Sequence, residues 1–140
     1  MSVRRISPAE ARTLMDEDGY AYLDVRSIPE FEAGHPTGAY NVPLLHAGPG
    51  GMTPNPDFLA VVQRSFPTDA KLVLGCRGGV RSLNAAELLT ASGYTGIVEQ
   101  RAGYEGSQQG ESGWVKQGLP TATEAEAARS YAELSATGEE

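Results

Sequence analysis

The one cysteine of this 140-residue chain stands in a setting that suits nucleophilic chemistry. Cys76 follows the apolar run KLVLG, and the next six residues, RGGVRS, contain two glycines and two arginines. A thiol becomes a strong nucleophile once it ionises, and the backbone N–H groups at a helix N-terminus favour the anion. Gly78 and Gly79 have no Cβ, so the backbone can curl close to the sulfur. The pattern predicts a reactive cysteine in a ring of N–H donors, with Arg77 and Arg81 adding positive charge.

A lone cysteine can instead be a small buried core residue. That role explains neither the two glycines nor the two arginines that follow Cys76, so we favour the nucleophile. The formal charge of -7 disfavours nucleic acid as a partner, and it makes two arginines beside the thiol conspicuous. A single cysteine also excludes an internal disulfide and cannot by itself form a structural zinc site.

The elements that must hold this loop alternate along the chain. Capping residues, hydrophobic periodicity and glycine stops define them. Strands are expected at 20–25, 39–43, 71–75 and 96–100. Helices are expected at 7–17, at 27–34, from 55 onward and at 81–93. A further helix is expected to end with residues 114–120, and an acidic C-terminal helix, capped by Thr123, is expected at 123–136. Residues 46–56 are rich in glycine and proline, which predicts a loop.

Strands that alternate with helices predict a three-layer α/β domain, with a central parallel sheet of about five strands and helices on both faces. Ligands bind beyond the carboxyl ends of such strands, and Cys76 lies at one of these ends. The first residues, MSVRRISPAEARTL, lack the apolar core of a signal peptide, and no apolar run reaches the length of a membrane span. We therefore expect a cytoplasmic protein with no membrane partner.

Several motifs together resemble the rhodanese (thiosulfate sulfurtransferase) family. CRGGVRS resembles its active-site loop, Cys-x-x-Gly-x-Arg-Ser. YLDVRSIPEFEAGHPTGAYNVP is similar to the family's Asp-Val-Arg strand end, Gly-His turn and Asn-Val-Pro segment, and GYTGIVEQRAGYEG and WVKQGLP resemble its closing strand and final helix. The resemblance implies one rhodanese-like domain over residues 1–122, followed by an acidic C-terminal helix or tail over residues 123–140.

The chain departs from the family pattern in two places. Ala102-Gly103 stands where the family often has Gly-Gly, and about seven extra residues, roughly 106–112, precede Trp114. Both departures concern the segment after the last expected strand, and neither touches the thiol.

The resemblance implies sulfur transfer through Cys76. Its thiolate attacks the outer sulfur of thiosulfate or another small anionic sulfane donor, and the resulting persulfide passes its sulfur to cyanide in an assay or to a thiol or protein acceptor in the cell. No cofactor or metal is required, and a monomer or weak homodimer is expected. The implied persulfide-binding loop consists of Arg77, Gly78, Gly79, Val80, Arg81 and Ser82.

Three further residues are expected to support the site, and a structural role is the simplest interpretation of each. Asp24 and Arg26 at the end of a strand are expected to form an ion pair that fixes neighbouring loops rather than to react. His35 is expected to hydrogen-bond backbone at a turn, with a general-base role as the alternative. Ser82 is a helix cap or loop stabiliser more than a proton donor.

Two other function classes stay open at this point. Cysteine phosphatases and arsenate reductases use Cys-x5-Arg, whereas four residues separate Cys76 from Arg81 here, which predicts a ring too small for a tetrahedral oxyanion. Gly75 also stands where such phosphatases usually carry a histidine. The second alternative is a sulfur-carrier or regulatory binding module with little turnover.

Overall fold

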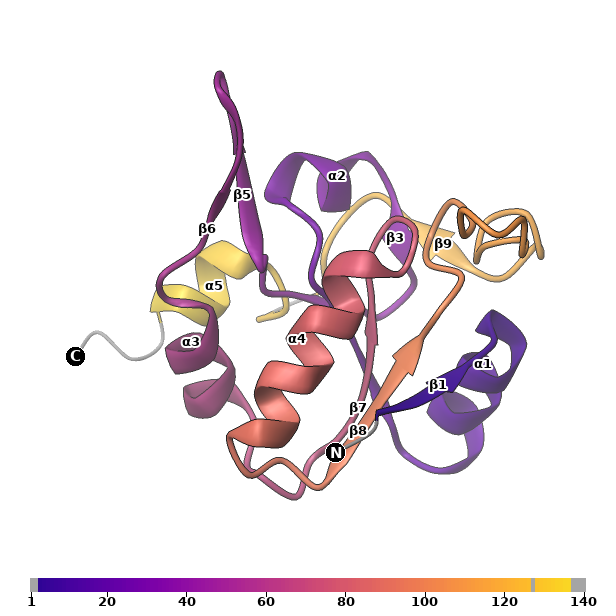
Figure 1. Cartoon of the computed structure of the whole chain (residues 1–140), viewed down its shortest axis with the longest axis horizontal. Coiled ribbons are helices and arrows are strands. Elements are labelled where there is room, and N and C mark those ends of the chain that lie inside the picture. The colour runs from indigo at the N-terminus through magenta and orange to yellow at the C-terminus, as the bar shows by residue number, and fades with distance from the viewer. Residues whose placement is uncertain (1–2, 127, 137–140) are drawn as a thin grey trace.

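The computed structural model describes residues 3–126 and 128–136. Its centre is a five-stranded parallel sheet in the order β1-β8-β7-β2-β4 (Figure 1). The strands are β1 (Arg4–Ile6), β2 (Ala21–Asp24), β4 (Tyr40–Asn41), β7 (Lys71–Gly75) and β8 (Gly96–Gln100). The helices are α1 (Pro8–Glu17), α2 (Ile28–Ala33), α3 (Phe58–Ser65), α4 (Val80–Ala91) and α5 (Tyr131–Ala136). The expected α/β architecture, with about five parallel strands and flanking helices, is confirmed.

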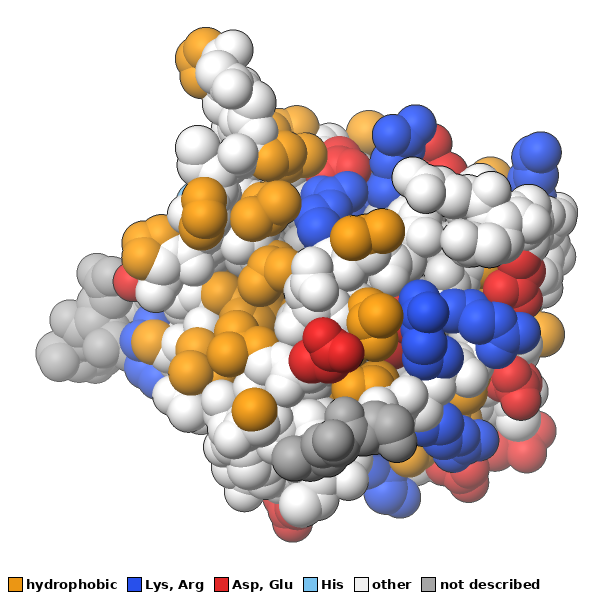
Figure 2. Space-filling view, viewed as in Figure 1, with side chains coloured by type: hydrophobic (Ala, Val, Ile, Leu, Met, Phe, Trp, Pro, Cys, Tyr) orange, Lys and Arg blue, Asp and Glu red, His pale blue; other side chains and the backbone are white. Residues whose placement is uncertain are grey.

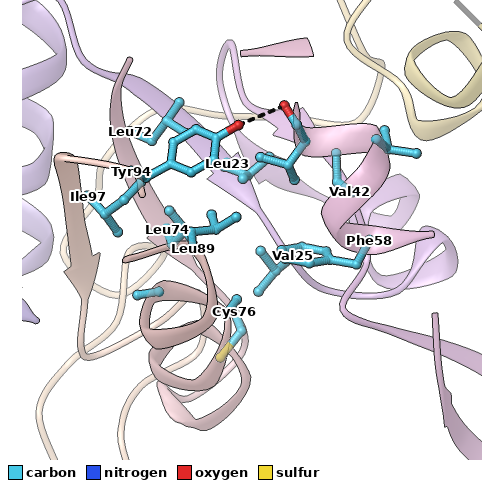
Figure 3. Packing of buried hydrophobic residues seen from close by; sticks show 14 of the residues in the cluster. Leu23, Val25, Val42, Phe58, Leu72, Leu74, Cys76, Leu89, Tyr94 and Ile97 are labelled. Carbon is cyan, nitrogen blue, oxygen red and sulfur yellow. Dashed lines mark hydrogen bonds between the residues drawn. The ribbon is translucent and has the colours of Figure 1, made fainter. Parts of the chain in front are cut away.

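Two apolar clusters cover the two faces of the sheet. Because successive strand residues point to opposite faces, Leu72 and Leu74 of β7 join one cluster while Val73 joins the other. The first cluster packs against α3, α4 and α5, and the second against α1 and Trp114. Figure 3 shows the first cluster, with Cys76 at its edge and the sulfur pointing away from the other labelled side chains.

Capping residues fix where the first two helices begin. Ser7 accepts a hydrogen bond from the Glu10 backbone N–H, and the Glu10 side chain accepts one from the Ser7 N–H. At α2 the backbone N–H and the hydroxyl of Ser27 both donate to Glu30. Both sites follow the Ser-x-x-Glu capping pattern that the sequence predicts.

The expectation of a loop over residues 46–56 was wrong. Strands β5 (Leu45–Gly48) and β6 (Gly51–Pro54) form an antiparallel hairpin that projects from the body of the domain (Figure 1). Gly51 has a φ of 107°, a conformation that glycine adopts without strain, so the glycines that suggested a loop instead make the hairpin turn.

The C-terminal predictions need two corrections. Residues 114–118 form successive turns instead of a helix. Gly118 ends them with a φ of 75°, outside the helical range, and the Trp114 indole N–H donates to the Pro120 carbonyl. The expected helix at 123–136 is present only as α5. Before it, β9 (Thr121–Ala122) pairs antiparallel with β3 (His35–Pro36), a small sheet that the sequence analysis missed. Residues 127 and 137–140 of the expected C-terminal helix and tail lie outside the described residues.

The sequence analysis also missed β1, which is three residues long and has only Ile6 buried. So short and polar a strand carries no alternation signal, and its pairing with β8 identifies it. Within the described ranges, no helix combines the length and the apolar character needed to cross a membrane.

Candidate active site

The thiol lies just beyond the carboxyl end of β7, where the chain turns into α4. Cys76 is 2% exposed, and its sulfur accepts a hydrogen bond from the Gly79 backbone N–H with N···Sγ 3.1 Å. Residues 76–82, which we call the cysteine loop, thus bring the Gly79 N–H to the sulfur, where the sequence predicts a ring of several such donors. Sulfur anions are favoured by such N–H groups at the start of a helix.

Two glycines allow this close packing. Gly79 has a φ of 99°, and a Cβ built there would lie 2.2 Å from the Arg101 carbonyl oxygen. Gly103 has a φ of 76°, and its Cβ would lie 2.3 Å from the Arg77 carbonyl oxygen. The segment after β8 therefore presses against the cysteine loop, with hydrogen bonds from the Tyr104 N–H to the Cys76 carbonyl and from the Glu105 N–H to the Arg77 carbonyl.

Gly75, directly before the thiol, is equally restricted. A Cβ at this position would lie 1.8 Å from the hydroxyl oxygen of Tyr22, which is itself buried and receives a hydrogen bond from Gln100. Burial raises the pKa of Tyr22 far above its usual range, so this hydroxyl stays neutral. A larger residue in place of Gly75 would displace this side chain from beneath the loop.

A buried carboxylate on β8 binds the Ser82 hydroxyl, which lies beside the sulfur at the start of α4. The Ser82 hydroxyl lies 3.3 Å from the Cys76 sulfur and donates a hydrogen bond to Glu99. Glu99 is 0% exposed, and the Arg5 guanidinium neutralises it with Nε···Oε1 2.6 Å. The sequence analysis expected Ser82 as a stabiliser but did not single out Glu99 or Arg5. Polar residues at the carboxyl end of a buried strand were the available signal, as for Asp24.

An open pocket lies above the thiol. Its volume is about 390 Å³, and Cys76 lies in its lining. The cysteine loop lines one side, and Glu105, Gly106, Ser107 and Gln108, which we call the 105–108 wall, line the other. The extra residues seen in the sequence therefore contribute directly to the pocket. Two hydrogen bonds close a turn in this segment: the Ser107 N–H donates to the Glu111 carbonyl, and the Glu111 N–H donates to the Ser107 hydroxyl. The Glu111 carboxylate also pairs with Arg101.

Arg81 turns from the loop toward α2. Its guanidinium makes two hydrogen bonds to the Glu30 carboxylate, of 2.7 and 3.0 Å, and both side chains are mostly buried. Burial alone would raise the pKa of Glu30, but the hydrogen bonds from Arg81 and Ser27 outweigh it and lower the pKa to about 2. This pair ties the start of α4 to the start of α2.

Arg77 lies at the mouth of the pocket and is also paired. Its Nε donates to Glu105 with N···O 2.9 Å, and the two side chains are 64% and 54% exposed. No local pattern predicts this partner, because Glu105 lies 28 positions away along the chain. Figure 2 shows the result on the surface, where Lys/Arg and Asp/Glu side chains alternate around the start of α4.

The other expected residues do not line the pocket. Arg26 pairs with Asp24 at 2.7 Å, donates to the Gly34 carbonyl at 2.6 Å, and stacks 4.3 Å from the centre of the Tyr104 ring. Burial would lower the pKa of Arg26, but the Asp24 carboxylate raises it above its ordinary value. His35 is buried, with Nδ1 2.7 Å from the Phe31 carbonyl. These residues hold the segments around the site.

The fold and the site together indicate a class of proteins. In this class, a cysteine follows a central strand of a parallel α/β sheet, and its sulfur lies at the start of the next helix as a nucleophile. The Rhodanese-like domain model matches residues 7–109. The chain belongs to this family, as its sequence motifs indicate.

Individual relatives agree with this assignment. The chain is 43% identical over 103 residues to "Thiosulfate sulfurtransferase 16, chloroplastic" of Arabidopsis thaliana, covering 74% of this chain and 80% of that protein. It spans only 53% of each of the next two plant relatives. Among solved structures, Rv0390 from M. tuberculosis has a TM-score of 0.73 at 28% identity, covering 89% and 100% of the two chains. The Human Single Domain Sulfurtransferase TSTD1 has a TM-score of 0.56 at 29% identity, covering 74% and 93%.

Proposed function

We propose that this protein is a sulfurtransferase that carries sulfane sulfur as a persulfide on Cys76. The observation that supports this most is the position of the thiol, held by the Gly79 N–H in the lining of an open pocket. Relatives named as sulfurtransferases support the same activity. The natural acceptor in this proposal is a thiol, either small or on a protein.

In this proposal, the residues of the cysteine loop carry out both steps of sulfur transfer. The Cys76 thiolate attacks the outer sulfur of a donor such as thiosulfate, the S–S bond of the donor breaks, and sulfite leaves with the bonding electron pair. The persulfide Cys76–S–S⁻ keeps the negative charge close to the N–H donors at the start of α4, where such charge is stabilised. A nucleophilic acceptor then attacks the terminal sulfur and releases the Cys76 thiolate.

Intact mass spectrometry tests this directly. Thiosulfate should add one sulfur, about 32 Da, to the wild-type protein, and cyanide should remove it and yield thiocyanate. Cys76→Ser should show neither the added mass nor thiocyanate formation. Thiocyanate production that persists in Cys76→Ser would end the proposal.

Turnover assays beside this experiment separate the two alternatives. Persulfide formation without turnover to any acceptor would favour a sulfur-carrier or binding module. Hydrolysis of p-nitrophenyl phosphate by the wild type would favour a phosphatase. We rank the phosphatase last because the loop has one residue fewer than Cys-x5-Arg, and because Tyr22 leaves no space for a side chain at position 75.

A further inference from the structure

The charges at the pocket mouth bear on which donor the site accepts. Arg77 and Arg81 are the basic residues in the pocket lining, and each has its own carboxylate, Glu105 and Glu30 respectively. The formal charges of these two pairs cancel, and the reacting thiolate adds one negative charge. The chain as a whole carries -7. A dianion such as thiosulfate therefore meets no net attraction from these residues.

The two pairs differ in how easily a substrate could break them. Arg81 and Glu30 are joined by two hydrogen bonds and are mostly buried, so this arginine is committed to the fold. Arg77 and Glu105 share one hydrogen bond and are more than half exposed, so water competes for both groups. Arg77 can leave Glu105 to meet an anion, but the Glu105 carboxylate then stays at the mouth and repels it. The repulsion is twice as large for a dianion as for a monoanion.

An apolar side chain completes this mouth. Val80 is 63% exposed, lines the same pocket, and lies at the first position of α4. An exposed valine beside a reactive sulfur offers contact to a carbon group and none to the oxygens of thiosulfate. Paired charges and an exposed apolar contact together suit an organic molecule with a single charge next to its sulfane sulfur.

We propose, on the basis of the sulfurtransferase function above, that Glu105 is a specificity-determining residue that selects a singly charged organic sulfane donor over thiosulfate. The donor class is R–S–S⁻ or a close analogue, in which R is an uncharged carbon group that lies against Val80. Transfer leaves R–S⁻, so one S–S bond breaks as another forms and no external oxidant or reductant is consumed.

The test compares two donors that differ by one charge at constant chemistry. Methanethiosulfonate replaces one oxyanion of thiosulfate by a methyl group, and loses its outer sulfur to Cys76 with release of methanesulfinate. The quantity to measure is kcat/KM for each donor, with cyanide as acceptor, because in a double-displacement reaction this ratio reports only the first half-reaction. Glu105→Gln is compared with Asp16→Asn, which also removes one negative charge from an exposed ion pair, that with Arg12 on α1, but lies outside the lining of this pocket.

We expect Glu105→Gln to raise kcat/KM about four- to tenfold for thiosulfate and by about the square root of that, two- to threefold, for methanethiosulfonate. The effect should disappear near 1 M salt, where charges at the surface are screened. Asp16→Asn should leave the ratio between the two donors unchanged. An unchanged ratio in Glu105→Gln, an equal change in Asp16→Asn, or a change that survives 1 M salt would each overturn the proposal.

The contact with Val80 has its own test. Benzenethiosulfonate and methanethiosulfonate carry the same charge and differ in apolar surface, so Val80→Ala should lower kcat/KM about two- to threefold more for the benzene derivative. An equal effect on both donors would contradict an organic group lying against Val80. Loading of Cys76 by either thiosulfonate or thiosulfate upholds the sulfurtransferase function whatever the ratios are. Failure of every donor to load Cys76 would overturn the function, and this proposal with it.

Discussion

The two sides of the pocket are built in different ways. The cysteine loop is one short stretch between β7 and α4, and its shape follows from its own glycines and from the start of a helix. The 105–108 wall comes from a segment about thirty positions later, held by turns, by Arg101–Glu111 and by Arg77–Glu105. This contrast fits the two proposals above, in which the loop carries the reaction and the wall selects the donor.

The largest effect should come from the tight packing of the loop. Gly79→Ala places a Cβ 2.2 Å from the Arg101 carbonyl in a backbone with a φ of 99°. Strain in that region together with the forced displacement of backbone should cost about 2–4 kcal/mol of unfolding free energy and abolish transfer. Urea denaturation and thiocyanate formation measure the two consequences.

Gly110 provides the matched control on the other side of the pocket. It has a similar φ of 94°, but a Cβ there would meet nothing within 4 Å. Gly110→Ala should therefore cost only about 1 kcal/mol, the price of the backbone conformation alone. Equal losses in both variants would mean that packing against Arg101 contributes nothing to the loop.

The same contrast explains what the sequence could predict. The loop is local, so glycines, arginines and a helix start within seven residues are sufficient to identify it. Most of the sheet can also be predicted from the sequence, because β2, β7 and β8 are apolar runs with clear ends. The wall depends on contacts between distant residues, and Glu105 has no local pattern that marks it as the partner of Arg77.

Glycine and capping signals were ambiguous where tertiary pairing decides the outcome. The glycines of 46–56 suit a loop and a hairpin turn equally, and only the pairing of Leu45 with Pro54 and its neighbours distinguishes them. Thr123 has the residue type of a helix cap, but residues 123–126 lie outside any helix, and the two residues before them pair with His35 and Pro36 as a strand. Asp24 and Glu99 occupy similar strand ends, yet only the structure shows that Glu99 reaches Ser82 beside the thiol.

An intermediate effect is expected for the pair that ties the loop to α2. Glu30→Gln keeps the capping box, since glutamine also serves at that position, but replaces the charged pair with Arg81. Loss of a charge-assisted, mostly buried hydrogen-bond pair should cost about 1–3 kcal/mol of unfolding free energy at pH 7.

The pH dependence of this loss identifies the pair as its source. The pKa of Glu30 is lowered to about 2 in the folded protein from an ordinary 4.5, so its contribution is complete above about pH 4.5 and is lost as the pH falls toward 2. The difference in unfolding free energy between wild type and Glu30→Gln should shrink over that interval. A difference that stays constant down to pH 2 would assign the loss to packing and not to ionisation.

The smallest effect on stability should come from the ion pair at the mouth. Arg77→Ala removes a pair that is more than half exposed on both sides, and such pairs contribute about 0–1 kcal/mol. Unfolding free energy should therefore change by less than about 0.5 kcal/mol, while the KM for thiosulfate should rise more than kcat falls, because the unpaired Glu105 carboxylate then faces the donor. Steady-state kinetics at low and high salt, run beside urea denaturation of the same variant, measure both quantities. If Arg77→Ala instead lost several kcal/mol with an unchanged KM at low salt, the wall would be part of the framework that holds the loop, and the division of roles between the two sides of the pocket would fail.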